Sequence, residues 1–140
     1  MYAVRMLYLT RRFSFSSSHR LHSTALDEKA NACAYGLCEN IHGHNYRLEV
    51  TVRGEPDAKT GFFCNVLDFA AVVDALVVKP CDHHYLNDVP LFAGAITTME
   101  GLSARIWTAL APALAAKGMT LSEILLGETD EHWVRLRDQP

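Results

Sequence analysis

The chain has 140 residues, of which 49% are hydrophobic and 21% are charged, and its formal net charge is -3. This length suits one domain with its own core, so a single domain is expected over residues 1–140. Lys and Arg form no block and no apolar run approaches ~20 residues, which argues against nucleic-acid binding and membrane insertion. Met1 to Arg12 lack the apolar stretch of a signal peptide. With four irregularly spaced cysteines, this predicts a cytoplasmic protein with reduced thiols.

Two strands separated by a long loop are predicted in the first half of the chain. Residues 4–15 are rich in Tyr, Leu, Phe and Val and should form a strand that ends near a run of serines. Residues 20–41 show no sustained period and are predicted to form a long functional loop. A second strand is expected over 44–53, because its apolar residues alternate with polar ones. The alternating apolar residues are Tyr46, Leu48, Val50 and Val52.

Two helices are predicted to follow. Apolar residues recur with helical spacing over 69–77, so a helix should begin near Asp68 and be stopped by Pro80. A second helix should begin near Thr98, and Pro112 within it is expected to kink or split it. The buried stripe expected along this helix consists of Leu102, Ile106, Leu110 and Leu114.

Two short strands, over 121–126 and 132–137, complete the predicted order ββααββ. Strands at both ends of the chain with helices between them are typical of an α+β fold. The sequence therefore predicts a four-stranded antiparallel sheet with two helices packed on one of its faces.

The most informative motif is the pair His42 and His44, which lies at the start of the second predicted strand. Side chains at alternate strand positions point to the same face, so both imidazoles can reach one divalent metal. Catalytic zinc usually has three protein ligands, and His19 at the end of the first strand is the best third candidate. His22 competes with it. The alternative is a surface pair of histidines that binds no metal.

Two further groups could move protons. Cys38 lies four residues before His42, which brings a thiol close to the predicted metal site. Asp82 and His83 are adjacent, and a carboxylate beside an imidazole can orient it as a proton relay. The alternative is an ordinary polar turn, in which Asp82 accepts hydrogen bonds from backbone amides.

Two glutamates are candidates for binding a ligand. Glu100 lies three residues after Thr97, the spacing of a helix capping box, so a structural role is a strong alternative for it. Glu128 follows the third predicted strand, where a carboxylate could accept paired hydrogen bonds from a guanine-like or pterin-like base. The alternative for Glu128 is a solvated turn residue.

Taken together, these segments resemble the 6-pyruvoyl-tetrahydropterin synthase and 6-carboxy-tetrahydropterin synthase (QueD-type) family. They occur in the family's order and cover nearly the whole chain. The matching segments are FSSSHRL at 15–21, CENIHGHNY at 38–46, DAKTG at 57–61, DHHYLN at 82–87, TME at 98–100 and ET at 128–129.

The resemblance implies a tunnelling fold (T-fold), in which ββααββ subunits form trimers and two trimers stack into a hexamer with active sites between subunits. It implies a zinc-dependent lyase that acts on 7,8-dihydroneopterin triphosphate and eliminates triphosphate. Cys38 would be the catalytic thiol, with Asp82 and His83 as its proton-relay partners. The implied Zn²⁺ ligands are His19, His42 and His44. The residues implied to bind the pterin ring are Glu128, Thr98 and Glu100.

The resemblance leaves the product open between two branches of the family. Three residues between Cys38 and His42 resemble the carboxy-forming enzymes of the queuosine pathway, whereas the loop over 23–37 looks more like the pyruvoyl-forming branch. The spacing favours 6-carboxy-5,6,7,8-tetrahydropterin, with 6-pyruvoyl-tetrahydropterin formation as the alternative. A T-fold protein that binds a pterin or purine without turnover and a zinc-dependent hydrolase are two further alternatives.

Overall fold

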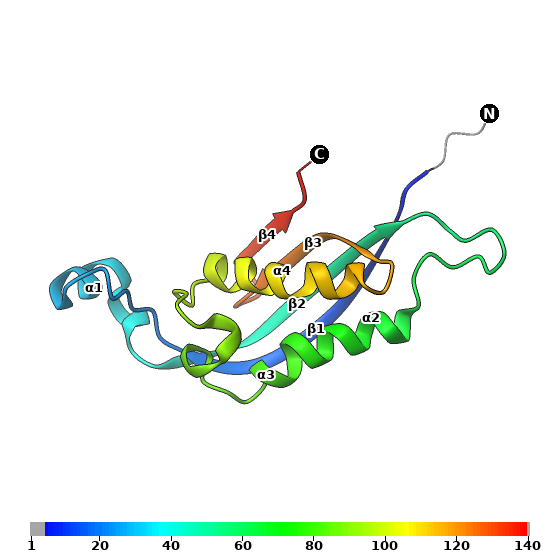
Figure 1. The fold of residues 1–140 in the computed structure, drawn as a ribbon. Coiled ribbons are helices and arrows are strands. Elements are labelled where there is room, and N and C mark those ends of the chain that lie inside the picture. The colour runs from blue at the N-terminus through cyan, green and yellow to red at the C-terminus, as the bar shows by residue number, and fades with distance from the viewer. Residues whose placement is uncertain (1–4, 140) are drawn as a thin grey trace.

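The computed structural model describes residues 5–139 and contains a four-stranded antiparallel sheet in the order β1-β2-β3-β4. The predicted α+β class and antiparallel sheet are confirmed. Figure 1 shows α2, α3 and α4 on one face of this sheet, while α1 lies apart, beyond the ends of β1 and β2. The strands are β1 (Leu7–His19), β2 (His42–Gly54), β3 (Thr120–Gly127) and β4 (Trp133–Arg137). The helices are α1 (Glu28–Tyr35), α2 (Val66–Val73), α3 (Lys79–Cys81) and α4 (Met99–Ala115).

The core lies between the sheet and the helices α2 and α4. Alternate residues of β2 from Tyr46 to Val52 are fully buried, as the apolar alternation predicts. The predicted stripe from Leu102 to Leu114 on α4 is also fully buried. Phe15 of β1 stacks on Tyr46 with ring centroids 5.1 Å apart, so the core extends toward the end of the sheet that carries the histidines. In residues 5–139, no helix has the length and apolar character needed to cross a bilayer.

The first strand differs from its predicted bounds of 4–15. Residue 4 lies outside the described residues, and the observed strand continues through the serine run to His19. Ser17 pairs with His44 and Ser18 with Gly43 in the β1–β2 register. The strand continues because the backbone of β2 supplies pairing partners there, which outweighs the preference of serine for turns.

The two prolines also act differently from their predicted effects. The helical segment that starts with α2 begins at Val66, with Asn65 as its cap. It continues through a π-helical turn over 74–78 and then through α3. Pro80 therefore lies inside the helical segment, and the wider π turn accommodates its ring. Pro112 does not split α4. Because Pro112 and Thr108 are both exposed, water can pair the carbonyl that the proline leaves free.

The segment over 20–41 differs from the predicted long functional loop, because it contains α1 and a 3-10 helix over 36–39. One buried side chain, Asn31, organises it. Asn31 Oδ1 accepts from Ser23 N over 2.8 Å, and its amide donates to the carbonyls of Ser23, Leu26 and Asp27. A single buried amide leaves no periodic signal in a sequence, so the pattern did not predict this order.

Asn31→Ala is expected to destabilise the segment over 20–41 by about 1–3 kcal/mol, because it leaves buried backbone groups unpaired. Hydrogen-exchange mass spectrometry should show faster exchange in this segment and unchanged exchange in β2 and β3. Lys29→Ala, at an exposed position on the same helix, serves as the matched control and should change little. Wild-type exchange rates in Asn31→Ala would contradict the organising role of Asn31.

Candidate functional site

Three histidines meet at the end of the β1–β2 hairpin. In the strand register, His19 lies opposite His42 and Ser17 lies opposite His44, so the three imidazoles share the core face of the sheet. One ligand nitrogen from each ring lies within 4.8 Å of the others. This arrangement brings together the predicted ligands, and the competing candidate His22 lies outside it.

Two of the three rings are oriented by a backbone carbonyl. His19 Nδ1 donates to Thr97 O over 2.9 Å, and His42 Nδ1 donates to Asn40 O over 2.7 Å. These bonds leave Nε2 of both rings free to coordinate a metal. Within residues 5–139, the buried Nε2 atoms of His19 and His44 have no hydrogen-bond partner. Convergent, unpartnered imidazole nitrogens fit a divalent metal such as zinc.

Burial favours the neutral form of two of the histidines, His19 and His44. Burial lowers the pKa of His19 from 6.5 to about 4, with smaller contributions from His42 and His44. Burial also lowers the pKa of His44, although Glu128 acts in the opposite direction. Neutral imidazoles are the form that binds a metal, so the protein environment prepares these rings for coordination.

Glu128 lies at the edge of the histidine cluster, immediately after β3. Its Oε2 is 3.3 Å from His44 Nε2 and its side chain is 21% exposed, so it is not the solvated turn residue of the alternative interpretation. The preceding residue, Gly127, is covered by the indole of Trp133, and a Cβ there would lie 2.7 Å from the ring. The close packing of Trp133 on Gly127 fixes the end of β3 from which Glu128 projects.

Asp82 and His83 form the predicted pair at the end of α3. Asp82 Oδ2 is 3.0 Å from His83 Nδ1, while Asp82 Oδ1 accepts from Ser16 N over 2.9 Å. The carboxylate thus orients the imidazole and also accepts from a backbone amide, so the turn contact of the alternative interpretation is present and the proton relay stays a prediction. The amide of Ser16, followed by the His83 side chain, lowers the pKa of Asp82 and keeps it ionised.

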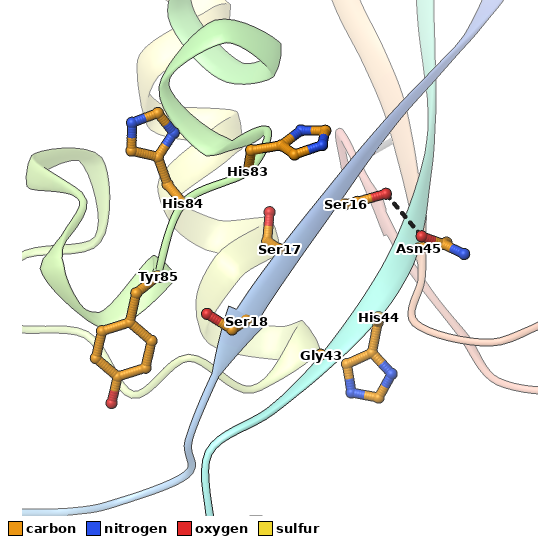
Figure 2. A pocket seen from close by; sticks show the side chains of 9 residues that line it. All are labelled: Ser16, Ser17, Ser18, Gly43, His44, Asn45, His83, His84 and Tyr85. Carbon is orange, nitrogen blue, oxygen red and sulfur yellow. Dashed lines mark hydrogen bonds between the residues drawn. The ribbon is translucent and has the colours of Figure 1, made fainter.

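The pair is attached to the outer edge of β1. His83 has a left-handed backbone with φ of 60° and donates its N–H to Ser16 O over 2.7 Å. Figure 2 shows His83 and His44 on opposite sides of β1, around a shallow depression lined by both. Asp82 and His83 are thus held at the outer edge of β1, and the three histidines are aligned by the pairing of β1 with β2.

Cys38 lies in the 3-10 helix over 36–39, where its side chain is exposed. Two exposed apolar residues flank it in the sequence. Leu37 is 86% exposed and Ile41 is 68% exposed. Cys33 is also exposed, whereas burial raises the pKa of the thiol of Cys81, the last residue of α3, to about 12. Cys81 therefore cannot supply a thiolate near neutral pH.

The start of α4 differs from the predicted capping box. Thr98, not Thr97, is the cap, and its Oγ1 accepts from Gly101 N over 3.1 Å. The exposed Glu100 is therefore not the capping partner of Thr97. Thr97 instead offers its carbonyl to His19, a contact that sequence spacing could not reveal because the two residues are 78 positions apart.

His22 has a different environment from the three clustered histidines. Its Nδ1 is 3.2 Å from Arg20 Nη2 and 3.9 Å from Glu39 Oε2. These neighbours follow His19 and Cys38 in sequence, so His22 links the end of β1 to the turn that carries the thiol. Leu21 N also donates to Cys38 O over 2.9 Å, which strengthens this link.

Comparison with known proteins identifies the family. The family model for 6-pyruvoyl tetrahydropterin synthase matches residues 8–139. A 6-pyruvoyl tetrahydrobiopterin synthase from Poecilia reticulata is 43% identical over 98% of this chain and 94% of the relative. The Dictyostelium discoideum protein of the same name is 41% identical over 96% of this chain and 98% of the relative.

More distant comparisons agree on the fold. A putative 6-carboxy-5,6,7,8-tetrahydropterin synthase from Archaeoglobus fulgidus is 27% identical over 82% of this chain and 91% of the relative. The structure of Caenorhabditis elegans 6-pyruvoyl tetrahydropterin synthase superposes with a TM-score of 0.88 and 28% identity, covering 99% of this chain and 100% of that one. The predicted fold is thus confirmed, and the chain belongs to the 6-pyruvoyl tetrahydropterin synthase family.

Proposed function

We propose that this chain is a zinc-dependent lyase that converts 7,8-dihydroneopterin triphosphate to 6-pyruvoyl-tetrahydropterin and releases triphosphate. The cluster of His19, His42 and His44 carries the proposal, because it brings one ligand nitrogen from each of three imidazoles to one point. Two relatives named for pyruvoyl formation are 43% and 41% identical to the chain, whereas a carboxy-type relative is 27% identical. We therefore prefer the pyruvoyl product to the carboxy product that the Cys38 to His42 spacing favoured.

The proposed chemistry divides among the chain's own residues. A zinc ion held by the three histidines would supply Lewis acidity at the hydroxyl groups of the substrate side chain. Cys38 would remove and return protons on one side, and His83, oriented by Asp82, would do so on the other. Triphosphate departs as hydrogen moves from the side chain to the ring, so no external oxidant or nucleophile is needed. Glu128 would accept hydrogen bonds from the pterin ring. Thr98 and Glu100 follow in sequence after Thr97, whose carbonyl accepts a hydrogen bond from His19.

We further propose that a second copy of the chain completes the site. His83 is bonded to the outer edge of β1, whereas the histidine cluster is aligned by the β1–β2 pairing, so a contact between copies would give one substrate access to both kinds of group. The exposed apolar residues Leu37 and Ile41 beside Cys38 suit such a contact. The expected assembly is a homo-hexamer built from two trimers, with each chain contributing one pterin-synthase-like domain.

Two alternatives have support in the geometry. The carboxylate of Glu128, 3.3 Å from His44 Nε2, could act as the base of a zinc-dependent hydrolase. A protein that only binds a pterin would need the histidines and Glu128 but not a reactive thiol. The presence of Cys38, Asp82 and His83 together favours the lyase over both.

Zinc-loaded protein incubated with 7,8-dihydroneopterin triphosphate is expected to release triphosphate and form 6-pyruvoyl-tetrahydropterin, identified by mass spectrometry. Removal of the metal with a chelator should abolish turnover, and added zinc should restore it. Carboxy-tetrahydropterin with acetaldehyde would replace the proposed product with the queuosine-type one. Dihydroneopterin with cleaved phosphates would indicate the hydrolase, and bound but unchanged substrate would indicate the binding protein.

Cys38→Ala is expected to lower kcat by roughly 10²–10⁴-fold, the usual contribution of a general acid or base. Cys33→Ala is the matched control, since Cys33 is also exposed, and it should retain activity. Iodoacetamide should inactivate Cys33→Ala as it does the wild type, with zinc retained. If Cys33→Ala instead resists inactivation, the reactive thiol is Cys33 and the assignment to Cys38 is wrong.

Mixing two inactive variants should restore activity if the site lies between copies. His42→Ala and His83→Ala, co-expressed with different tags and purified through both, should recover roughly a quarter of wild-type activity. This fraction follows when each site takes its histidine cluster from one chain and His83 from a symmetry-related neighbour. Doubly tagged assemblies of a single variant are the control. Mixed assemblies as inactive as this control would show that one chain supplies both groups.

A further inference from the structure

The residue that follows His19 is held by one side chain on both of its backbone polar groups. Arg20 N donates to Asn87 Oδ1 over 3.0 Å, and Asn87 Nδ2 donates to Arg20 O over 2.9 Å. β1 ends at His19, so Arg20 has no strand partner to fix it. The amide of Asn87 therefore takes the place of a paired backbone and extends the strand geometry past its last residue.

Thr97 contacts both Arg20 and the residue before it, His19. Thr97 Oγ1 donates to Arg20 O over 3.0 Å, and Thr97 O accepts from His19 Nδ1 over 2.9 Å. The side chain of His19 is fully buried and Thr97 is 1% exposed, so water cannot replace these bonds. One residue thus holds the imidazole ring of His19 and the backbone just beyond it.

The segment that carries Asn87 also follows the outer edge of β1. Its earlier residues bond to this edge through His83 N to Ser16 O, over 2.7 Å, and Ser18 N to His84 O, over 3.1 Å. The contact between Asn87 and Arg20 is the last in this series. The same edge strand, β1, therefore carries the backbone of His19 and fixes the position of His83.

From these contacts we infer that Asn87 and Thr97 are positioning residues, which fix the His19 ring so that its Nε2 points at the metal. Two torsions would otherwise let the ring turn away, and the Nδ1 bond also fixes the tautomer. Asn87 acts on the backbone from which the ring projects, and Thr97 acts on that backbone through its hydroxyl and on the ring through its carbonyl. This inference rests on the proposed metal centre and adds to it the groups that orient one ligand.

The test compares zinc binding across variants by competition with a chromophoric chelator. Asn87→Ala removes the amide, and Thr97→Val removes the hydroxyl donor while it keeps the carbonyl that His19 uses. Thr97→Ser is the conservative variant that retains the donor. Asn65→Ala is the structural control, because Asn65 caps α2 through bonds to Leu67 N and Asp68 N and has no part in the histidine cluster.

Asn87→Ala is expected to bind zinc roughly 10–100-fold more weakly, the usual effect of losing a group that orients a ligand. Thr97→Val should be weakened in the same direction, and Thr97→Ser should recover affinity close to wild type. The Co²⁺-loaded proteins should show an altered visible spectrum in the same two weakened variants. Asn65→Ala should lower Tm while its zinc affinity and Co²⁺ spectrum stay those of the wild type.

Wild-type zinc affinity and Co²⁺ spectra in both Asn87→Ala and Thr97→Val would overturn the inference and leave the metal centre intact. A wild-type protein that binds neither Zn²⁺ nor Co²⁺ would overturn the metal centre, and the positioning role with it. Should Asn87→Ala fail to fold, the difference in zinc affinity between Thr97→Val and Thr97→Ser decides. Equal affinity in that pair would count against the positioning role.

Discussion

The register of the β1–β2 hairpin is the constraint on which the site depends. His19 faces His42 directly across the strands, and His44 follows two positions along the same face. A shift of the register by one residue would turn one strand's side chains to the opposite face and disperse the cluster. The buried side chains that fill the same face beyond the histidines, Phe15 and Tyr46 among them, make such a shift costly. The apolar core thereby determines the geometry of the polar site.

β1 serves two structures at once, because both of its edges are used. Its inner edge pairs with β2 and brings His19 into the cluster. Its outer edge binds the segment after α3 through the backbones of Ser16 and Ser18, which holds the Asp82 and His83 pair. His83 adopts a positive φ, a locally strained conformation, where it makes this attachment. Two groups of candidate functional residues are therefore fixed by the two edges of one strand.

Local patterns predicted what depends on local structure, and missed what depends on distant partners. The alternation over 46–52 and the spacing of His42 and His44 are properties of one strand, so periodicity predicted the sheet and two of the clustered histidines. The third, His19, followed from the pairing of the strands. The order within 20–41 and the role of Thr97 could not be predicted, because each rests on a few buried hydrogen bonds without sequence periodicity.

The polar end of the core also links stability to ligand binding. The buried Nε2 of His19, the buried Nε2 of His44 and the buried hydroxyl of Tyr46 lack hydrogen-bond partners within residues 5–139. Each such group costs about 1–3 kcal/mol relative to a paired one. Burial also raises the pKa of Tyr46, so its hydroxyl stays protonated and can donate a hydrogen bond. A metal on the histidines would offset the cost of their two nitrogens, and the surrounding fold would gain the binding free energy. A bound metal would thus complete this part of the core.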